Sequence, residues 1–422
     1  MIEIHQALSM ILERARPRAP ERQALDQALG RVLAEDVISD IDSPPYDKAL
    51  MDGYAVVASD LRGGRGELIV VDEVAAGDIP CEPLQSGMAT RIMTGAPVPR
   101  GADAIVVDEC CRLDEAGGMP TVRIDDRDVR PGQNILGRGR SVRRGETVLQ
   151  IGRRLSAIDA GLLAEVGRTQ VLVHASPRVA VLPTGSELVP ACDVPGPGQI
   201  RNSNGPMLGA LVSSAGGQPV DLGIARDTES ELARQMNRGL HEDILILSGG
   251  VSTGDFDLVP HVLRDLGVEQ VFHGVRLKPG RPLWFGVLPH AKGSRLVFGL
   301  PGNPVSGLVC FELFVRPTIA ALAALPQMPR PTIAARLSAP FRHLGDRPTY
   351  FPVRLEGDRL EGGRLKDDGD PALARLLDWK GSADLRTLAC ADGLALFPAG
   401  RSEYALDETV QVMLLERGLF AH

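Results

Sequence analysis

The sequence predicts an α/β multidomain protein with a central doubly wound, mostly parallel α/β domain. An N-terminal helical and extended domain, a small β-rich inserted domain and a C-terminal all-β domain accompany it. Three observations lead to this prediction. A chain of 422 residues is long enough for two to four domains. Strand-like apolar runs alternate with helical patterns over residues 178–325. Short β-like runs separated by Gly and Pro occur on both sides of that region.

The N-terminal domain is expected to be discontinuous, formed by residues 1–45 and 140–175. Apolar residues recur at helical spacing in residues 2–15, and a second helix is predicted over residues 22–36. The helical pattern returns at residues 155–167. We therefore expect these helices to pack together around an inserted segment.

Residues 46–139 are expected to form the inserted β-rich domain. Its β-like runs, LIVVDEV, AIVVDE and TVRI, are separated by Gly and Pro. After the proline-rich PQMPRP at 326–331, the sequence becomes β-like again with Gly- and Asp-rich turns. Residues 327–422 are therefore predicted to form a separate all-β domain.

The α/β domain is expected over residues 176–326. Apolar runs typical of buried parallel strands are RVAVLP (178–183), DILIL (243–247) and RLVFGL (295–300). A helix beginning near Thr228 has a Thr-x-x-Glu pattern with Glu231, which predicts a capping box. A long helix is expected from Pro304.

Composition narrows the classes of partner and location. The chain has 46 basic and 54 acidic residues and a formal net charge of −8, which is unfavourable for general nucleic-acid binding because affinity there comes from neutralising phosphates. No segment approaches a membrane span, and the amphipathic N-terminus lacks the apolar core of a signal peptide. The six cysteines form no C-x-x-C pair, and no HExxH occurs. We expect a cytoplasmic protein with reduced thiols, no structural zinc and no membrane or nucleic-acid partner.

Three predicted strand ends have unusual compositions: LPTGSEL (182–188), LSGGVSTGDFD (247–257) and GLPGNPVSG (299–307). In an open α/β sheet, ligands bind beyond the carboxyl ends of the strands. Glycine lets a backbone approach a ligand, and free N–H groups at helix starts favour anions. These stretches therefore predict a pocket for an anion or phosphate. Its substrate-binding candidates are Ser248, Gly249, Gly250, Ser252, Gly302 and Asn303. Ordinary turns, in which Gly, Ser and Asp are common, are the alternative interpretation.

Carboxylates beside an anion pocket require a compensating charge, and a divalent metal bridging acids and phosphates is the usual one. The acidic candidates are Glu187, Asp227, Asp255 and Asp257. Positive charge is expected from RLKPGRP (276–282), which supplies Arg276, Lys278 and Arg281. No GxxxxGKS or GxxxxGKT occurs, so the chain is not a P-loop NTPase.

Longer motifs extend over nearly the whole chain: MDGYAV (51–56), RIMTGAPVPRGADAIV (91–106), PTGSELV (183–189), SGGVSTGDFD (248–257), LKPGRP (277–282), GLPGNPVSGLVCFELFVRP (299–317) and, more weakly, GSADLRTLACADGLALFP (381–398). In these motifs and their order, the chain resembles the molybdopterin molybdenumtransferases, or molybdenum insertases, which include bacterial MoeA and the E domain of gephyrin.

The resemblance implies four domains and a homodimer with its active site at the subunit interface. It also implies insertion of molybdate into adenylylated molybdopterin, with release of AMP and a role for Mg²⁺. The product would be molybdenum cofactor. Transient contacts with the adenylyltransferase of the same pathway and with molybdoenzyme clients are implied as well.

Site residues follow from the matching positions. The resemblance implies that Asp52 and Thr94 are an active-site acid and hydroxyl, supplied by the subunit opposite the α/β domain. The other positions implied to be catalytic are Glu187, Asp227, Asp257 and Lys278, with Glu187 and Asp257 as metal ligands. Further positions implied to bind substrate are Arg281, Pro301, Pro304, Arg347 and Ser382.

The chain departs from the family pattern at several of these positions. Lys48-Ala49-Leu50 stands where Asn-Ser-Ala is usual, and Ser186 and Ser141 stand where aspartates are usual. Arg281 replaces a lysine, and Arg140 adds a cation. The departures leave three alternatives open: an active insertase, a carrier or scaffold that binds the cofactor with little turnover, and an enzyme for a related oxyanion such as tungstate or a modified pterin dinucleotide.

Overall fold

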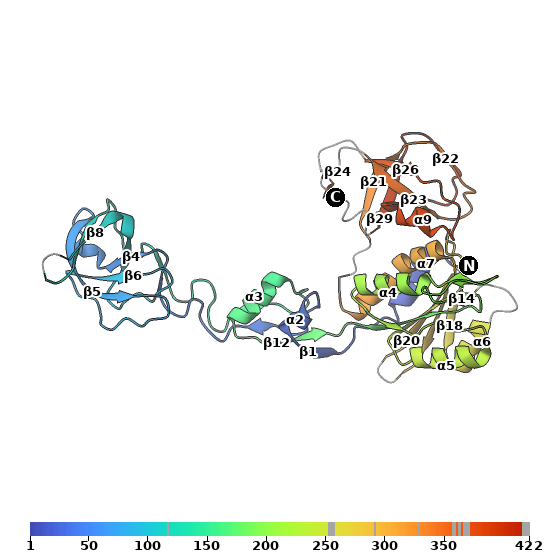
Figure 1. Ribbon diagram of the computed structural model, residues 1–422, viewed down its shortest axis with the longest axis horizontal. Coiled ribbons are helices and arrows are strands. Elements are labelled where there is room, and N and C mark those ends of the chain that lie inside the picture. Colours follow the sequence, from blue (N-terminus) through green and yellow to red (C-terminus); the bar gives the residue numbers. More distant parts are fainter. Residues whose placement is uncertain are drawn as a thin grey trace. The chain divides into compact units, whose positions relative to one another are not determined.

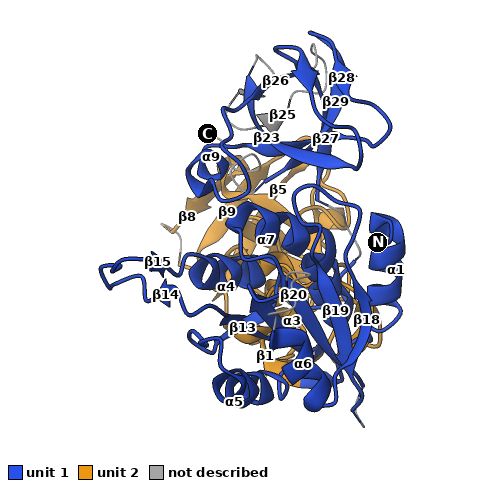
Figure 2. Cartoon of the chain, turned by 90° about the vertical axis from the view of Figure 1, so that its right-hand side faces the viewer, with its two compact units in different colours: residues 1–21, 30–32, 173–422 blue, residues 22–29, 33–172 orange. Residues whose placement is uncertain are grey.

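The computed structural model describes residues 1–115, 118–251, 258–290, 293–326, 330–356, 360–361, 364–365 and 372–415. It divides the chain into two compact units, coloured separately in Figure 2. Unit 1 comprises Met1–Glu21, Gly30–Val32 and Val173–His422, and unit 2 comprises Arg22–Leu29 and Leu33–Leu172. The chain passes between them within β1 (Pro20–Ala24) and β12 (Gln170–His174), and also before and after Gly30–Val32. The four domains and their boundaries stay a prediction.

A six-stranded sheet forms the centre of unit 1, in the order β16-β13-β17-β20-β19-β18. The first four strands are paired in parallel, and β19 is antiparallel to both of its neighbours, β20 and β18. The strands are β16 (Gln218–Asp221), β13 (Arg178–Pro183), β17 (Ile244–Ser248), β20 (Arg295–Leu300), β19 (Trp284–Leu288) and β18 (Glu269–His273). The mostly parallel sheet confirms the predicted fold class.

Helices cover both faces of this sheet (Figure 1). One buried cluster contains side chains of α1 (Ile4–Leu12), α4 (Asn204–Ser214) and α7 (Pro304–Cys310). The other contains side chains of α5 (Glu229–Gly239) and α6 (Leu258–Asp265). Because alternate residues of the buried strands point into both clusters, the apolar runs of the sequence are nearly continuous.

The start of α5 differs in one detail from the prediction. Thr228 is the N-cap residue as expected, but its side chain makes no capping hydrogen bond. A capping box also needs the N-cap N–H for the Glu231 side chain, and that N–H donates instead to Arg226 O at 2.7 Å. The position of the helix start was therefore right, and the capping box was wrong.

The predicted long helix from Pro304 contains a π-helical turn at Phe311–Val315 before α8 (Arg316–Leu322). This segment, Pro304–Leu322, is long and apolar enough to cross a membrane, but 72% of its most apolar window is buried inside the protein. It is a core helix of the α/β domain.

A closed barrel follows, formed by β21 (Thr332–Leu337), β26 (Ala372–Leu376), β23 (Thr349–Glu356), β27 (Gly393–Phe397) and β29 (Thr409–Leu414). Smaller elements are β22 (Phe341–Arg342) paired with β28 (Glu403–Tyr404), β24 (Leu360–Glu361) paired with β25 (Arg364–Leu365), and α9 (Leu385–Ala389). Main-chain hydrogen bonds connect the barrel to the α/β domain: Lys278 N–H donates to Pro348 O at 2.9 Å, and Tyr350 N–H donates to Lys278 O at 2.8 Å.

Unit 2 contains a second six-stranded sheet, in the order β7-β4-β6-β5-β9-β8. Its strands are β7 (Ala104–Val107), β4 (Gly53–Val56), β6 (Met88–Ile92), β5 (Arg65–Val74), β9 (Thr121–Asp125) and β8 (Cys111–Asp114). Short strand pairs accompany it: β2 (Val37–Ile38) with β11 (Thr147–Leu149), and β3 (Lys48–Ala49) with β10 (Ile135–Leu136).

The helical part of unit 2 is smaller than predicted. The third expected helix is present as α3 (Ala157–Glu165), which begins with a capping box between Ser156 and Asp159. The helix expected over residues 22–36 is wrong, since only α2 (Leu25–Ala28) is helical. Gly30 has φ 76°, a left-handed conformation that ends a helix. The residues before α2, Pro20–Ala24, form β1 instead.

Candidate functional site

The three strand ends singled out in the sequence lie side by side in unit 1. Pro183 of β13 is paired with Ser248 of β17, and Ser248 is paired with Leu300 of β20. The turns after these strands are also joined, because Thr184 N–H donates to Ser248 O at 2.9 Å. They enclose a cavity of about 590 Å³, here named the strand-end cavity. Its polar and glycine lining residues are Thr184, Gly185, Glu187, Asn204, Asp227, Ser248, Gly249, Gly250, Gly302 and Asn303.

Two glycines of these turns are required by close approaches. A Cβ on Gly249, which has φ +102°, would lie 2.5 Å from Thr184 O. A Cβ on Gly185, which has φ +154°, would lie 2.6 Å from both carboxylate oxygens of Glu187. Glycine at these two positions lets adjacent turns touch and lets the Glu187 carboxylate fold against the backbone.

Two exposed carboxylates, Glu187 and Asp227, line the strand-end cavity. Asp227 Oδ2 accepts a hydrogen bond from Ser186 N–H at 3.0 Å, and Asp227 N–H donates to Ser186 Oγ at 3.1 Å. Ser186, where the family usually has an aspartate, therefore holds Asp227 in place. Among the described residues, no three His, Cys, Asp or Glu side chains gather as a metal-binding group. The predicted site residues Ser252 and Asp257 lie outside the described part of the chain, as does the acidic candidate Asp255.

A second cavity of about 960 Å³ lies where the loop after β18 meets the barrel; we name it the barrel cavity. It shares Pro282, Pro301 and Asn303 with the strand-end cavity, so the two have a common wall. Its basic side chains are Lys278, Arg281, Arg342, His343, Arg347 and Lys380. Its aromatic side chains are Phe341, Phe351 and Trp379. The arrangement gives a carboxylate-bearing compartment beside a cationic one.

The C-terminal part of the chain supplies two of the predicted substrate-binding residues. Arg347 and Ser382 line the barrel cavity together with Lys278. Ser382 is tied to the turn after β20, because Asn303 Nδ2 donates to Ser382 Oγ at 2.9 Å and Val305 N–H donates to Ser382 O at 3.0 Å. Pro304 lies at the first turn of α7, a position that proline favours because its missing N–H needs no partner there.

Asp52 and Thr94, the remaining predicted pair, belong to unit 2 and contact each other. Asp52 Oδ1 accepts hydrogen bonds from Thr94 N–H at 2.6 Å and from Thr94 Oγ1 at 2.7 Å. These bonds, the backbone one first, hold the pKa of Asp52 below its ordinary value. Asp52 is therefore an exposed carboxylate that stays ionised into the acid range.

Thr94→Val is expected to raise the pKa of Asp52 relative to the native protein, because it removes the hydroxyl donor. The pKa should still remain below the ordinary value, since the bond from the backbone N–H is retained. A ¹³C NMR titration of the Asp52 carboxyl group in native protein and in Thr94→Val measures the two pKa values. Asp42 is an internal control: its pKa is lowered by bonds from Arg144 N–H and the Arg138 side chain, and it should not move. An unchanged Asp52 pKa would contradict the assignment.

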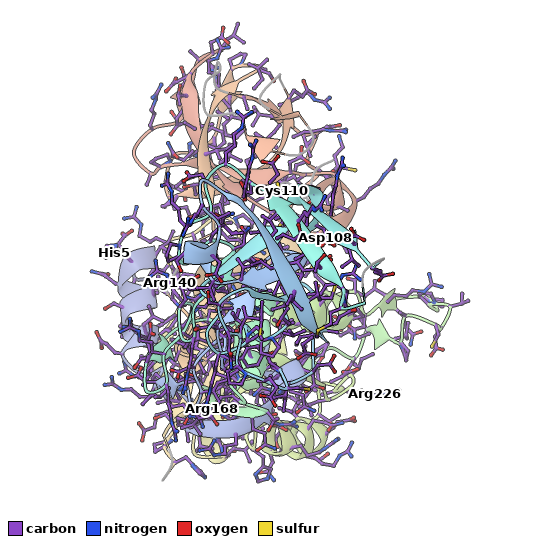
Figure 3. The ribbon with its side chains drawn as sticks, turned by 90° about the vertical axis from the view of Figure 1, so that its left-hand side faces the viewer. His5, Asp108, Cys110, Arg140, Arg168 and Arg226 are labelled. Atoms are coloured by element: carbon purple, nitrogen blue, oxygen red, sulfur yellow. The ribbon has the colours of Figure 1, made fainter. Side chains whose placement is uncertain are left out.

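Of the other departures, Arg281 lines the barrel cavity in unit 1, whereas Lys48, Arg140 and Ser141 lie in unit 2. Lys48 is in β3, and Ser141 N–H donates to Ser43 O at 3.0 Å, so Ser141 is fixed by its backbone. Arg140 is exposed and is labelled in Figure 3. Nearby, the Asp42 carboxylate accepts hydrogen bonds from Arg138 Nε at 2.7 Å and Arg144 N–H at 2.9 Å. Asp42, an acid that sequence reasoning did not single out, therefore balances the charge of Arg138 in this turn.

Sequence reasoning missed several residues that line the two cavities: Thr184, Asn204, Arg342, Lys380 and Trp379. Thr184 was within a highlighted stretch, and Asn204 begins a helix directly after another polar run, so both carried a local signal. The barrel residues carried none, because their proximity to Lys278 comes from the docking of the barrel.

This fold and site define a multidomain α/β protein with an acidic cavity at the strand ends and an adjoining cationic cavity beside the barrel. Residues 2–167 match the model of the MoeA N-terminal region (domain I and II), and residues 180–321 match that of the probable molybdopterin binding domain. The molybdopterin molybdenumtransferase of Bacillus subtilis (strain 168) is 33% identical over 419 residues, which are 98% of this chain and 94% of that protein. That of Staphylococcus epidermidis (strain ATCC 12228 / FDA PCI 1200) is 32% identical over 407 residues, 94% of this chain and 91% of that protein.

A solved structure gives the same result. The molybdopterin biosynthesis MoeA protein from Pyrococcus horikosii has a TM-score of 0.80 and 32% identity, covering 98% of this chain and 99% of that one. The chain belongs to the MoeA family of molybdopterin molybdenumtransferases, which confirms the resemblance seen in its motifs.

Proposed function

We propose that this protein inserts molybdate into adenylylated molybdopterin with Mg²⁺-dependent release of AMP, giving Mo-molybdopterin. The observation that carries the proposal is the pair of cavities with a common wall. One presents glycine-rich turns, hydroxyl-bearing residues and carboxylates, and the other presents cations. The two substrates are a pterin dithiolene that bears a pyrophosphate, and molybdate. Together they need both kinds of surface.

The residues described at the strand-end cavity fit a magnesium ion held jointly with substrate. Mg²⁺ is usually bound by one or two carboxylates together with waters and substrate phosphates. Glu187 and Asp227 are exposed carboxylates on that cavity. We assign Glu187 and Asp257 as ligands, Asp257 from its motif alone. The ion would neutralise charge on the pyrophosphate.

The chain's own groups account for the remaining requirements. Ser248, Ser252 and the glycine-rich turns would bind the substrate, with Pro301 and Pro304 shaping the turn that carries Gly302 and Asn303. Lys278, Arg281 and Arg347 would stabilise negative charge that develops on the phosphate and on molybdate. The acids Asp227 and Asp257 would orient water or molybdate for attack on the pyrophosphate.

Asp52 and Thr94 are proposed to complete the site from the second subunit of a homodimer. Support comes from their motif positions and from the lowered pKa that keeps the Asp52 carboxylate charged. Sedimentation equilibrium checks the dimer, and a monomer that retains full activity would contradict it. We further propose a cytoplasmic location and transient contacts with the pathway's adenylyltransferase and with molybdoenzyme clients, which co-purification from cell extract would test.

The experiment for the proposed function measures AMP release from adenylylated molybdopterin with and without Mg²⁺ and molybdate. Native protein is expected to release AMP in a molybdate-stimulated, Mg²⁺-dependent reaction. Asp257→Ala and Glu187→Gln are expected to reduce release by about 10²-fold or more, because each removes a charged group that the reaction requires. The same rate in both variants as in native protein would contradict the assignment.

A carrier or scaffold is the second candidate, favoured by Ser141 and Ser186 at positions where the family usually has aspartates. It predicts tight binding of the pterin substrate by native protein with no AMP release under any condition. Replacing molybdate with tungstate in the same assay separates the third alternative, since a tungstate enzyme would release AMP faster with tungstate.

A further inference from the structure

The loop that carries Arg347, residues 343–348, connects β22 to β23 and lies against the turn between β27 and β28. Gly345 has φ +68°, and a Cβ on it would lie 2.9 Å from Arg401 O. Only glycine lets the loop approach that turn so closely. The contact is fixed by a main-chain hydrogen bond, in which Gly400 N–H donates to Gly345 O at 2.8 Å.

The imidazole of His343 joins the two ends of this loop. Gly345 N–H donates to His343 Nδ1 at 3.2 Å, and Thr349 Oγ1 lies 3.3 Å from the same nitrogen. A backbone N–H can only donate, so Nδ1 is an acceptor and the proton of the neutral ring is on Nε2. Thr349 Oγ1 also contacts Arg347 O at 3.2 Å. One nitrogen atom of His343 therefore contacts the chain on both sides of Arg347.

Three aromatic rings fix the orientation of the imidazole. It is stacked on Phe341, with ring centroids 5.8 Å apart and an interplanar angle of 16°. The rings of Phe397 and Tyr404 also lie 5.8 Å from it, at tilted angles. Ring contacts of this kind favour particular geometries. They keep Nδ1 of His343 facing the loop.

His343 carries no charge at neutral pH. Burial lowers the pKa of its imidazole from the ordinary value, and the positive charge of Lys278 lowers it further. The backbone of Arg401 and the charge of Asp346 act in the opposite direction and are outweighed. Tyr404 also packs against the ring, and burial raises its pKa, so it is neutral as well. The imidazole is therefore a hydrogen-bond acceptor and not a further cation of the barrel cavity.

The other contacts near Arg347 hold it less firmly. Arg347 Nε lies 3.2 Å from Asp346 Oδ2, but this ion pair is within the loop and moves with it. Arg276 Nη2 donates to Asp346 O at 2.9 Å in an exposed position, where solvent competes for both groups. The contacts of His343 Nδ1 are partly buried and span the loop. Their loss should therefore change the position of Arg347.

We propose that His343 is a positioning residue, whose Nδ1 holds the loop so that Arg347 is in place for an oxyanion in the barrel cavity. This inference rests on the proposed function for the identity of the anion, molybdate. His343 does not touch the anion itself. It acts by preorganisation, because a side chain whose backbone is already fixed loses less conformational freedom when the ligand binds.

Two substitutions separate the acceptor atom from the ring. Asn places its Oδ1 at the position of the His Nδ1, whereas Gln places its oxygen one atom farther from the backbone. Both variants lose the ring contacts equally. His343→Gln is expected to raise the Kd for molybdate, measured by isothermal titration calorimetry, about tenfold, as for the loss of one hydrogen bond. His343→Asn should raise it by less than about threefold, because an acceptor remains.

A double-mutant cycle tests whether His343 acts through Arg347. In an Arg347→Ala background, His343→Gln should leave the molybdate Kd unchanged, because the side chain that it positions is absent. A further tenfold loss in that background would overturn the positioning role and indicate a general loss of structure. The control is His174→Gln. Nδ1 of His174 contacts Arg18 O at 3.1 Å, and His174 is not among the described lining residues of either cavity, so its Kd should match the native value.

The pH profile gives a readout that does not depend on the folding of His343→Gln. Protonation of Nδ1 removes the acceptor, so the native Kd for molybdate should rise as the pH falls below the ordinary histidine range. In His343→Asn the acceptor does not titrate, and this rise should be absent. The same rise in both proteins would overturn the proposal. Tighter binding by native protein at acid pH would also overturn it, since the imidazolium would then bind the anion directly.

The inference and the proposed function fail in different ways. Native protein that releases no AMP, yet shows this pattern of molybdate affinities, would reject the proposed insertase and leave the role of His343 intact. AMP release by native protein, with equal molybdate affinities for native, His343→Asn and His343→Gln, would reject this inference alone.

Discussion

Lys278→Ala is expected to lower kcat/KM for AMP release by about 10²- to 10³-fold, the usual effect of removing one group that stabilises developing negative charge. Lys278 lies in the barrel cavity beside Arg347 and Ser382. Its backbone is fixed on both sides by hydrogen bonds to Pro348 O and from Tyr350 N–H, so truncating the side chain should leave the loop in place. Steady-state kinetics and a urea unfolding curve, measured on the same preparation, distinguish a loss of catalytic activity from a loss of folded protein.

Lys380→Ala is the control for this experiment. Lys380 also lines the barrel cavity, but its Nζ already pairs with Asp378 Oδ2 at 2.6 Å and its side chain is 71% exposed. Its charge is largely balanced and solvated, so we expect a much smaller loss of activity. Lys278→Arg should restore part of the activity, because the charge remains while its geometry changes. Equal losses for Lys278→Ala and Lys380→Ala would argue against a specific role for Lys278.

Glu312→Ala is expected to lower the free energy of unfolding by about 3–5 kcal/mol, as is usual when one partner of a buried ion pair is removed. The Glu312 side chain is fully buried in the π-helical turn of the long core helix. Its carboxylate accepts hydrogen bonds from Arg316 Nε at 2.6 Å and from Arg330 Nε at 2.7 Å. Removing it would leave two guanidinium groups without this buried carboxylate. Urea unfolding at neutral pH measures the loss.

The same substitution predicts a pH dependence. Burial raises the pKa of Glu312, but hydrogen bonds from Arg330 and Arg316 outweigh it, so the pKa lies below its ordinary value. A carboxyl with a depressed folded-state pKa adds stability above its unfolded pKa and loses it as the pH falls through the folded value. The stability difference between native protein and Glu312→Ala should therefore be largest near neutral pH and shrink below the ordinary glutamate range.

An exposed pair gives the comparison for Glu312. Glu356 pairs with Arg375 Nε at 2.6 Å, with both side chains close to half exposed. Glu356→Ala is expected to cost less than about 1 kcal/mol, because solvent already stabilises both charges. If Glu312→Ala cost no more than Glu356→Ala, the buried cluster would not contribute to the stability of this part of the fold.

Much of the α/β domain could be predicted from local pattern. The apolar run of β17, Ile244–Ser248, is followed at once by glycines, and β13 and β20 end in similar turns. Because parallel strands bring their carboxyl ends to one edge of a sheet, this pattern was enough to place the strand-end cavity. Local pattern failed where competing bonds decided the outcome, as when Thr228 N–H donated to Arg226 O rather than to Glu231.

The barrel cavity could not be predicted in the same way. Arg342, Trp379 and Lys380 face the Lys278 loop only because the barrel docks on the α/β domain, and no periodicity in the chain records that docking. The bond between Asn303 and Ser382 joins residues 79 positions apart, and that between Ser186 and Asp227 joins residues 41 apart. Motif resemblance supplied Lys278, Arg347 and Ser382 individually, but the structure brought them to one cavity.

The sequence by itself determined the α/β class, the three strand ends that line one cavity and the family, since each depends on a pattern of contiguous residues. Tertiary structure decided which side chains meet: the pairing of Ser186 with Asp227, and the cationic wall of the barrel cavity. The physical reason is that hydrogen bonding and burial depend on distance in space, and residues brought close by packing of separate elements leave no mark on the spacing between them.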